Sequence, residues 1–218
     1  MIVLGIDGAL GEFSAAVARD GAIAAQASVR GNVALESGLA VVANVMAAAG
    51  ISAHDLGRVA VGAGPGGFTG LRIALSYAKS LAQAWQRPLV AVDSFDLLEY
   101  GASFRRALTV VVGRRGVISA RYRDSSQTLR SSGWVAQALD ELNGALRQPG
   151  ELPVIGAPED VLAALAERAI VVRPHLPLVI PAASAAALLG ASRDPAASVH
   201  AVRADYGELP AARVPRLK

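Results

Sequence analysis

The sequence predicts a two-lobed α/β protein in which mixed β-sheets are flanked by helices. Short apolar runs alternate with longer segments of helical periodicity, and the first strands are joined by turn residues as hairpins. Hydrophobic residues make up 53% of the 218 residues, which is enough for a substantial core. The chain has no cysteine, which excludes a disulfide framework, a thiolate metal site and a cysteine nucleophile.

The first half of the chain gives the clearest order of elements. We expect, in order, strands at 2–6, 13–18 and 22–29, a helix over 33–49, a strand at 58–63, a helix over 69–86 and a strand at 89–92. This order is that of the ribonuclease-H-like half-unit of the actin-like ATPase architecture. The sequence therefore predicts a two-lobed actin-like ATPase (ribonuclease-H-like) fold.

The second half repeats the pattern more weakly. Its expected elements are a hairpin of strands at 109–112 and 117–123, helices near 134–146 and 159–168, strands near 153–156 and 170–173, and a short alanine-rich helix after Pro181. Apolar periodicity breaks near 101–106, so we predict an N-terminal lobe over 1–102 and a degenerate second lobe over 103–218.

A glycine-rich loop between the strand at 58–63 and the next helix carries the most information. Gly62, Gly64 and Gly67 match the G-x-G-x-x-G fingerprint of nicotinamide dinucleotide sites, and Asp93 ends the next strand. Pro65 inside the turn and the late helix start argue against that function, which stays an alternative. A Walker loop is excluded, because no Gly-Lys-Ser/Thr follows.

Two interpretations of the loop remain open. Its backbone N–H groups, with a helix N-terminus capped by Thr69, favour an anion. Alternatively, the glycines let strand and helix pack closely.

Asp7, at the end of the first strand, has two possible roles. It lies where actin-like ATPases keep a carboxylate near nucleotide phosphate and magnesium. Alternatively, it stabilises a turn. The three histidines have no metal-ligand spacing, so we predict neither a metal site nor a catalytic residue.

The string Gly-Pro-Gly-Gly-Phe-Thr-Gly-Leu-Arg-Ile at 64–73 resembles the signature of the TsaB family, the bacterial partners of the threonylcarbamoyl transferase TsaD, formerly grouped with glycoproteases. Ile6-Asp7, residues 78–82 and residues 92–95 extend the resemblance over about 1–100. It implies a non-catalytic subunit of the tRNA threonylcarbamoyladenosine machinery, which activates TsaD and helps recruit the small ATPase TsaE. The loop residues that match are Gly64, Pro65, Gly66, Gly67, Phe68, Thr69, Gly70 and Arg72.

The chain departs from the family pattern at four places. Asp7-Gly8-Ala9 replaces the usual Asp-Thr-Ser, and Gly67 stands where serine is common. Ala34 occupies the place of a frequent histidine, and residues 112–119 lack the typical Asp-Ala-Arg-x-Gly-Glu-Val-Tyr segment. These losses argue against catalysis in this chain and leave the glycine loop intact.

The helices of the first lobe predict a protein partner. The segment 38–49 has no charge on any face, and a helix that is apolar all round must be covered on all sides. The resemblance implies that such helices pair with TsaD, or with a second copy when TsaD is absent. The predicted contact residues are Leu39, Val42, Val45, Met46, Ile73 and Tyr77. Alternatively, the abundant alanine reflects a GC-rich genome alone.

The remaining expectations concern cofactors, RNA and location. No cofactor is expected in this chain itself, with ATP or ADP binding at the interface of the complex. A net charge of +3 is too small to identify nucleic acid as a partner, so tRNA contact is expected only through the complex. The arginines at 105–130 are candidates for such a contact. Alternatively, they form the solvated face of a hairpin. Without a signal peptide or apolar span, a cytoplasmic protein with no membrane contact is expected. An independent actin-fold nucleotide-binding protein stays an alternative function.

Overall fold

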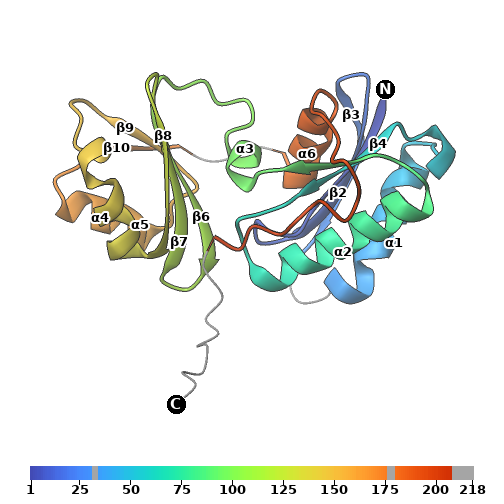
Figure 1. The fold of residues 1–218 in the computed structure, drawn as a ribbon, viewed down its shortest axis with the longest axis horizontal. Helices are drawn as coiled ribbons and strands as arrows, with labels where there is room; N and C mark the ends of the chain where they lie inside the picture. The colour runs from blue at the N-terminus through green and yellow to red at the C-terminus, as the bar shows by residue number, and fades with distance from the viewer. Residues whose placement is uncertain (31–33, 176–179, 208–218) are drawn as a thin grey trace, which may run out of the picture.

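Two five-stranded mixed sheets form the framework of the protein, one in each lobe (Figure 1). The computed structural model describes residues 1–30, 34–175 and 180–207. The first half contains β1 (Ile2–Asp7), β2 (Phe13–Arg19), β3 (Ala22–Val29), α1 (Ala34–Ala48), a short 3-10 turn η1 (Ala53–Asp55), β4 (Arg58–Gly62), α2 (Phe68–Ala84), β5 (Leu89–Val92) and α3 (Ser94–Leu98). The second half contains β6 (Ala107–Arg114), β7 (Val117–Arg123), β8 (Thr128–Trp134), α4 (Val135–Leu146), β9 (Leu152–Ile155), α5 (Glu159–Glu167), β10 (Val172–His175) and α6 (Ala182–Gly190).

The two sheets share one connectivity. The first has the order β3-β2-β1-β4-β5, and the second, taken from its opposite edge, has the order β8-β7-β6-β9-β10. In each, the first three strands are antiparallel neighbours and the last two run parallel to the first. This repetition confirms the predicted pair of ribonuclease-H-like lobes, although α3 and β8 were not predicted. No helix within the three described ranges is long and apolar enough to cross a bilayer.

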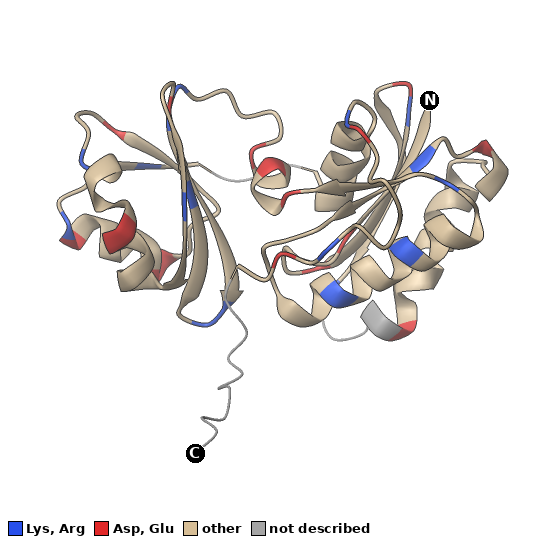
Figure 2. Cartoon of the chain, in the orientation of Figure 1, with Lys and Arg blue, Asp and Glu red and all other residues tan. Residues whose placement is uncertain are grey.

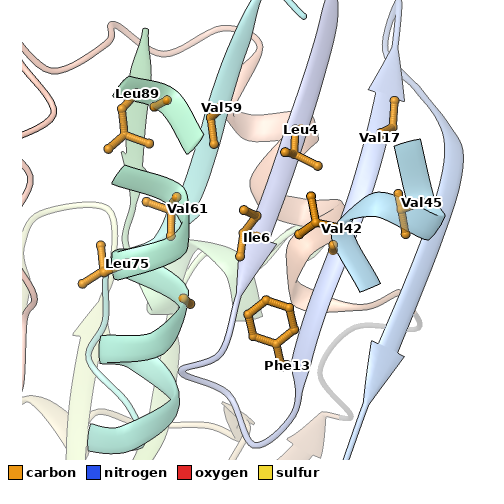
Figure 3. Close-up of a cluster of buried hydrophobic side chains, with 14 of the residues drawn as sticks. Leu4, Ile6, Phe13, Val17, Val42, Val45, Val59, Val61, Leu75 and Leu89 are labelled. Carbon is orange, nitrogen blue, oxygen red and sulfur yellow. The ribbon is translucent and has the colours of Figure 1, made fainter. Parts of the chain in front are cut away.

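Helices α1 and α2 lie side by side on one face of the first sheet (Figure 1). Val42, Val45 and Met46 of α1 point into the core, where Val42 and Val45 are each only 2% exposed. Figure 3 shows Val42 near Leu4 and Ile6 of β1, and Val45 near Val17 of β2. The prediction that Val42, Val45 and Met46 contact a partner is therefore wrong. The chain's own sheet covers this face of the helix.

Helix α6 covers the other face of the first sheet and corrects the predicted lobe boundary. It contacts all five strands of that sheet, and Ala185, Ala186 and Ala187 are fully buried there. The approach is so close that a Cβ atom on Gly5 would overlap the Ala183 carbonyl oxygen. Residues 191–207 then continue along the first lobe, with the Ala196 amide donating to the Leu89 carbonyl (2.9 Å). The second lobe therefore ends near β10 rather than extending over all of 103–218.

Strands β6 and β7 of the second lobe are buried along most of their length. Leu139, Leu142 and Leu146 on one face of α4 pack with Tyr122 of β7, and α5 packs beside α4 and β10. The other face of this sheet meets α3, which follows the last strand of the first lobe and contacts β6. Each lobe thus ends in a helix that packs on the other lobe.

Adjacent residues of α1 should respond oppositely to the same substitution. Val42→Glu places an unpaired carboxylate in the core and should lower the free energy of unfolding by at least about 3 kcal/mol. Ala43→Glu lies on the exposed face and should change it by no more than about 0.5 kcal/mol. Urea denaturation followed by circular dichroism measures both. Equal effects of the two variants would contradict the orientation of the helix.

Candidate functional site

The glycine loop, residues 62–70, is packed against backbone from two other segments. A Cβ atom on Gly66 would overlap the Ala9 carbonyl oxygen, and one on Gly70 would overlap the Gly8 carbonyl oxygen. Gly64 has φ +98° and lies against the carbonyl of Asp205. Side chains at these positions would push apart the turn after β1, the loop and residues 191–207.

Backbone groups at both ends of the loop are hydrogen-bonded within the chain. The Gly67 amide donates to the Ala9 carbonyl (2.8 Å), the Ala63 amide donates to the Val92 carbonyl (2.8 Å), and the Ala63 carbonyl accepts from the Asp205 amide (2.8 Å). Helix α2 begins at Phe68 with Gly67 as its N-cap residue, without a side-chain hydrogen bond, and Thr69 is exposed. Thr69 is therefore not the cap that the sequence predicted. Of the two interpretations of the loop, close packing is the one that these contacts support.

The exposed side of the loop carries aromatic rings and an arginine. The Phe68 side chain is 56% exposed, and its ring lies 5.1 Å, between centroids, from that of Tyr206. The Arg72 guanidinium lies 5.1 Å from the centre of the Phe68 ring. Of the loop residues that matched the family signature, Phe68, Thr69 and Arg72 are thus the ones that a partner molecule can reach.

Asp7 is fully buried at the end of β1. Its Oδ1 accepts hydrogen bonds from the amides of Ala9 (3.2 Å) and Leu10 (3.3 Å), whereas its Oδ2 has no hydrogen-bond partner among the described atoms. Burial raises the pKa of Asp7 from 3.8 to about 7, against the lowering effect of these amides. The carboxyl group holds the turn that closes on the glycine loop, as one of the two predicted roles requires.

The cavity beside Asp7 does not suit magnesium and a nucleotide phosphate. Its volume is about 350 Å³, and Leu10, Leu98 and Ile180 contribute to its lining. Glu12 brings a second carboxylate, while the Arg30 side chain at the rim pairs with Glu12. No cluster of three or more His, Asp or Glu side chains with metal-site spacing occurs in the part of the chain that the structure describes. At a pKa of about 7, the Asp7 carboxyl group is protonated in about half of the molecules at pH 7, which weakens its attraction for a cation.

Acidic residues on and around α3 hold the two lobes together (Figure 2). Asp93 caps α3 by accepting from the Phe95 amide (2.8 Å), and its other oxygen pairs with Arg130 of β8 (2.6 Å). Asp96 pairs with Arg121 (2.6 Å). Burial would raise the pKa of Asp96, but hydrogen bonds from arginines outweigh this effect and lower the pKa. Asp93 therefore serves as a cap and an ion-pair partner, not as the ribose ligand of a nicotinamide site.

Glu99, just after α3, is the most buried member of this cluster. Its oxygens accept from Arg121 (3.0 Å) and Arg123 (2.5 Å), and from the hydroxyl of Thr109 (2.5 Å). The side chains of Arg121 and Glu99 are each only 8% exposed. The prediction that Arg121 is a candidate for tRNA contact, or part of a solvated face, is therefore wrong, whereas Arg123 keeps 31% of its side chain exposed and stays a candidate.

The outer surface of α1 is largely apolar and open, whereas most exposed residues of α2 are polar, among them Thr69, Arg72 and Ser76. Helix α1 packs on β2, β3 and α2, while its Leu39 remains 49% exposed beside the exposed Ala40, Ala43 and Ala47. Ile73 and Tyr77 of α2 are half-buried, and the Tyr77 ring packs edge-on against Phe13. We call Leu39, Ala40, Ala43 and Ala47, with Ile73 and Tyr77, the pairing surface. Of the predicted contact residues, only Leu39, Ile73 and Tyr77 belong to it.

Comparison with known proteins gives a family. The family model of TsaD, tRNA N6-adenosine threonylcarbamoyltransferase, matches residues 35–187, from α1 to α6. The chain belongs to the TsaD family. The tRNA threonylcarbamoyladenosine biosynthesis protein TsaB of Escherichia coli (strain K12) is 30% identical over 112 residues, 51% of this chain and 48% of that protein. The predicted resemblance to TsaB is thereby confirmed, and the chain spans about half the length of the curated relatives it matches.

Solved structures show the same fold. A protein from Pseudomonas aeruginosa, described as uncharacterized with similarity to peptidase YEAZ, has a TM-score of 0.67 at 16% identity, over 95% of this chain and 99% of that chain. YeaZ from Pseudomonas aeruginosa has a TM-score of 0.51 at 23% identity, over 59% of this chain and 66% of that chain. For this member of the TsaD family, the predicted actin-like fold is thus confirmed across nearly the whole chain.

Sequence reasoning missed the acidic cluster that joins the lobes of this TsaD-family chain. A signal was present, since Asp93, Asp96 and Glu99 are spaced three residues apart, as on one face of a helix. Arg121 and Arg123 are likewise two residues apart on one face of a strand. The pairing itself depends on contacts between residues that lie 22 to 37 positions apart in the sequence.

The buried carboxyl of Asp7 should make stability depend on pH. Between about pH 4 and pH 7 the folded chain binds this proton more than the unfolded chain, so the free energy of unfolding should fall as pH rises. The slope should approach roughly 1 kcal/mol per pH unit. Urea titrations from pH 5 to 8 should show a flatter profile for Asp7→Asn than for the wild type, with the exposed Asp194→Asn as control. Identical profiles for Asp7→Asn and the wild type would contradict this assignment.

Removing the charge of Glu99 should weaken the junction between the lobes. Glu99→Gln leaves the buried Arg121 with one carboxylate fewer and should cost about 2 to 4 kcal/mol of unfolding free energy. Glu167→Gln, at an exposed position of α5, should cost no more than about 0.5 kcal/mol. Chemical denaturation compares the two, and a cost for Glu99→Gln no larger than that of the control would show that the cluster contributes little.

Proposed function

We propose that this chain is an accessory, non-catalytic subunit of the machinery that forms threonylcarbamoyladenosine on tRNA. In this proposal it binds a TsaD protein through the pairing surface on α1 and α2. The observation that carries the proposal is the exposed apolar face of α1 in a chain of the TsaD family. The similarity to TsaB of Escherichia coli supports the same pathway.

The shape of the pairing surface favours another helix as its partner. Ala40, Ala43 and Ala47 follow the three- and four-residue spacing that places side chains on one helical face. Their small side chains would let a second helix backbone approach closely, and Leu39 would insert beside it. In α1, Glu36 is the one charged residue. An exposed apolar face of this kind is unfavourable in water, and its burial against an apolar partner would stabilise the complex.

The interior of the chain supports an accessory role. The glycine loop packs against the chain's own backbone, and burial raises the pKa of Asp7 to about 7, so about half of these carboxyl groups keep the proton at pH 7. Gly8 and Ala9 provide no hydroxyl beside it. The proposal therefore assigns the transfer reaction to TsaD, and any ATP or ADP to the interface of the complex. A TsaE protein would join the assembled pair, and without TsaD two copies of this chain would pair through the same surface.

Charge placed on the pairing surface should separate this chain from TsaD. Leu39→Glu and Ala43→Glu should each weaken binding to the TsaD protein of the same cell by at least about 10-fold, because a carboxylate would be buried against an apolar partner. Ala136→Glu, at an exposed alanine of α4, is the matched control. Analytical size exclusion measures the complex, and tRNA modification with each component omitted measures the activity.

The two measurements test separate parts of the proposal. Wild-type affinity of both variants for TsaD would reject the pairing surface. Unchanged tRNA modification when this chain is omitted would reject the accessory role itself.

A further inference from the structure

A second exposed surface lies where the turn between β6 and β7 meets the glycine loop. It consists of five residues from four segments, which we call the junction surface: Phe68, Arg72, Arg114, Trp134 and Tyr206. Figure 2 shows basic positions at the β6–β7 turn and near the start of α2, on the same side of the molecule. The proposed pairing through α1 and α2 does not use this surface.

Backbone contacts make the junction surface continuous across the two lobes. A Cβ atom on Gly113, beside Arg114, would lie 3.9 Å from the Gly66 carbonyl oxygen. One on Gly207, which follows Tyr206, would lie 3.3 Å from Pro65 of the loop and would overlap the hydroxyl of Ser119 in β7. The first and second lobes therefore contribute neighbouring parts of one surface.

The aromatic rings of the junction surface are open to solvent, and an arginine guanidinium lies against two of them. Trp134 is 58% exposed, and the Arg114 guanidinium lies 5.2 Å from the centre of its ring. Phe68 is 56% exposed with Arg72 at 5.1 Å, and Tyr206 is 39% exposed beside it. Large rings at these exposures cost free energy in water and are typical of recognition sites.

A cavity of about 490 Å³ opens between Trp134 and residue 207. This volume is in the usual range for small-molecule sites. Arg114 and Arg130 line it and bring guanidinium groups, while the hydroxyls of Ser131 and Ser132, which donate to Glu141 and Ser119, can accept hydrogen bonds. Glu141 is the one carboxylate in the lining, and hydrogen bonds from Ser131 and Gln137 lower its pKa, so it stays ionised and can accept from an amino group.

We propose that the junction surface binds an unstacked, single-stranded segment of RNA. Flat aromatic faces stack on nucleobases, arginines beside them attract phosphates, and the cavity next to Trp134 offers polar groups for the edge of one base. An acidic protein segment would use the arginines but would leave the exposed rings without a planar partner. The inference rests on the proposed function only for the identity of the RNA as tRNA.

Binding of a short RNA to the isolated full-length chain tests the proposal. The probe is a fluorescein-labelled single-stranded RNA of about 12 nucleotides, followed by anisotropy. Trp134→Ala should weaken binding by about 5- to 100-fold, because one stacked base is lost. Arg114→Glu should weaken it and reduce its salt dependence. Arg105→Glu is the control, since Arg105 is exposed just before β6, at the opposite end of the strand that Arg114 ends.

A second readout separates stacking from charge attraction. In a Trp85→Phe background, Trp134 is the single tryptophan, and RNA should quench its fluorescence. Polyglutamate serves as a competitor without bases. Displacement of the RNA by polyglutamate at equal charge concentration, with no quenching of Trp134, would overturn the proposal. Equal affinities of the wild type and Trp134→Ala would also overturn it.

The RNA result and the TsaD result can fail independently. Trp134→Ala should still bind TsaD as the wild type does, and Leu39→Glu should still bind the RNA probe. Loss of RNA binding in Leu39→Glu together with retained binding in Trp134→Ala would place the RNA on the pairing surface and reject the junction surface.

Discussion

The first sheet must be covered on both faces, and the rest of the fold depends on this constraint. Strands β1 and β4 are apolar along nearly their whole length, so neither face tolerates water. Helices α1 and α2 cover one face, and α6 arrives from the end of the chain to cover the other. Glycine at position 5, under α6, permits that approach. A fragment ending near residue 102 would leave one face of this sheet bare, so the lobes are interdependent in folding although their topologies are separate.

The same exchange of helices fixes the lobes relative to each other. Helix α3 leaves the first lobe to pack on β6, and its acidic neighbours meet arginines of β7 and β8. Because Glu99 and Arg121 are nearly inaccessible to water, their attraction is screened less than that of a surface pair. Residues 191–207 add a further contact between the lobes, because Gly207 at the end of this segment lies between Pro65 of the glycine loop and Ser119 of β7. The junction surface is thus held from both sides, as a site for an extended ligand requires.

Sequence patterns predicted the elements that an apolar run, alternation or helical spacing marks, and missed the features that long-range contacts decide. The strands at 22–29 and 89–92 have the predicted bounds, because alternation or a short apolar run marks them. Helix α1 was predicted, but the sequence did not show which of its faces points into the core, because a helix that is apolar on all sides gives no periodic signal. Edge strand β8 is mostly polar, and α3 is too short for periodicity. The spacing of glycines could not distinguish a phosphate cradle from close packing, which only the carbonyls of Ala9 and Asp205 decide.

Alanine serves opposite purposes in two helices of this chain, and composition alone cannot separate them. In α6 the alanines are buried because only a small side chain lets the helix backbone lie on the sheet. In α1 they are exposed, and an exposed alanine costs little free energy, so a GC-rich genome could have placed them there without function. Leu39 is the residue that distinguishes the two explanations. Leu39 is a large, half-exposed side chain at the N-terminal end of the alanine face, and an excess of alanine in the genome does not explain it. Beside an approaching helix it would gain contact area that its small neighbours leave open. The apolar surface of α1 is therefore better explained by a partner than by composition.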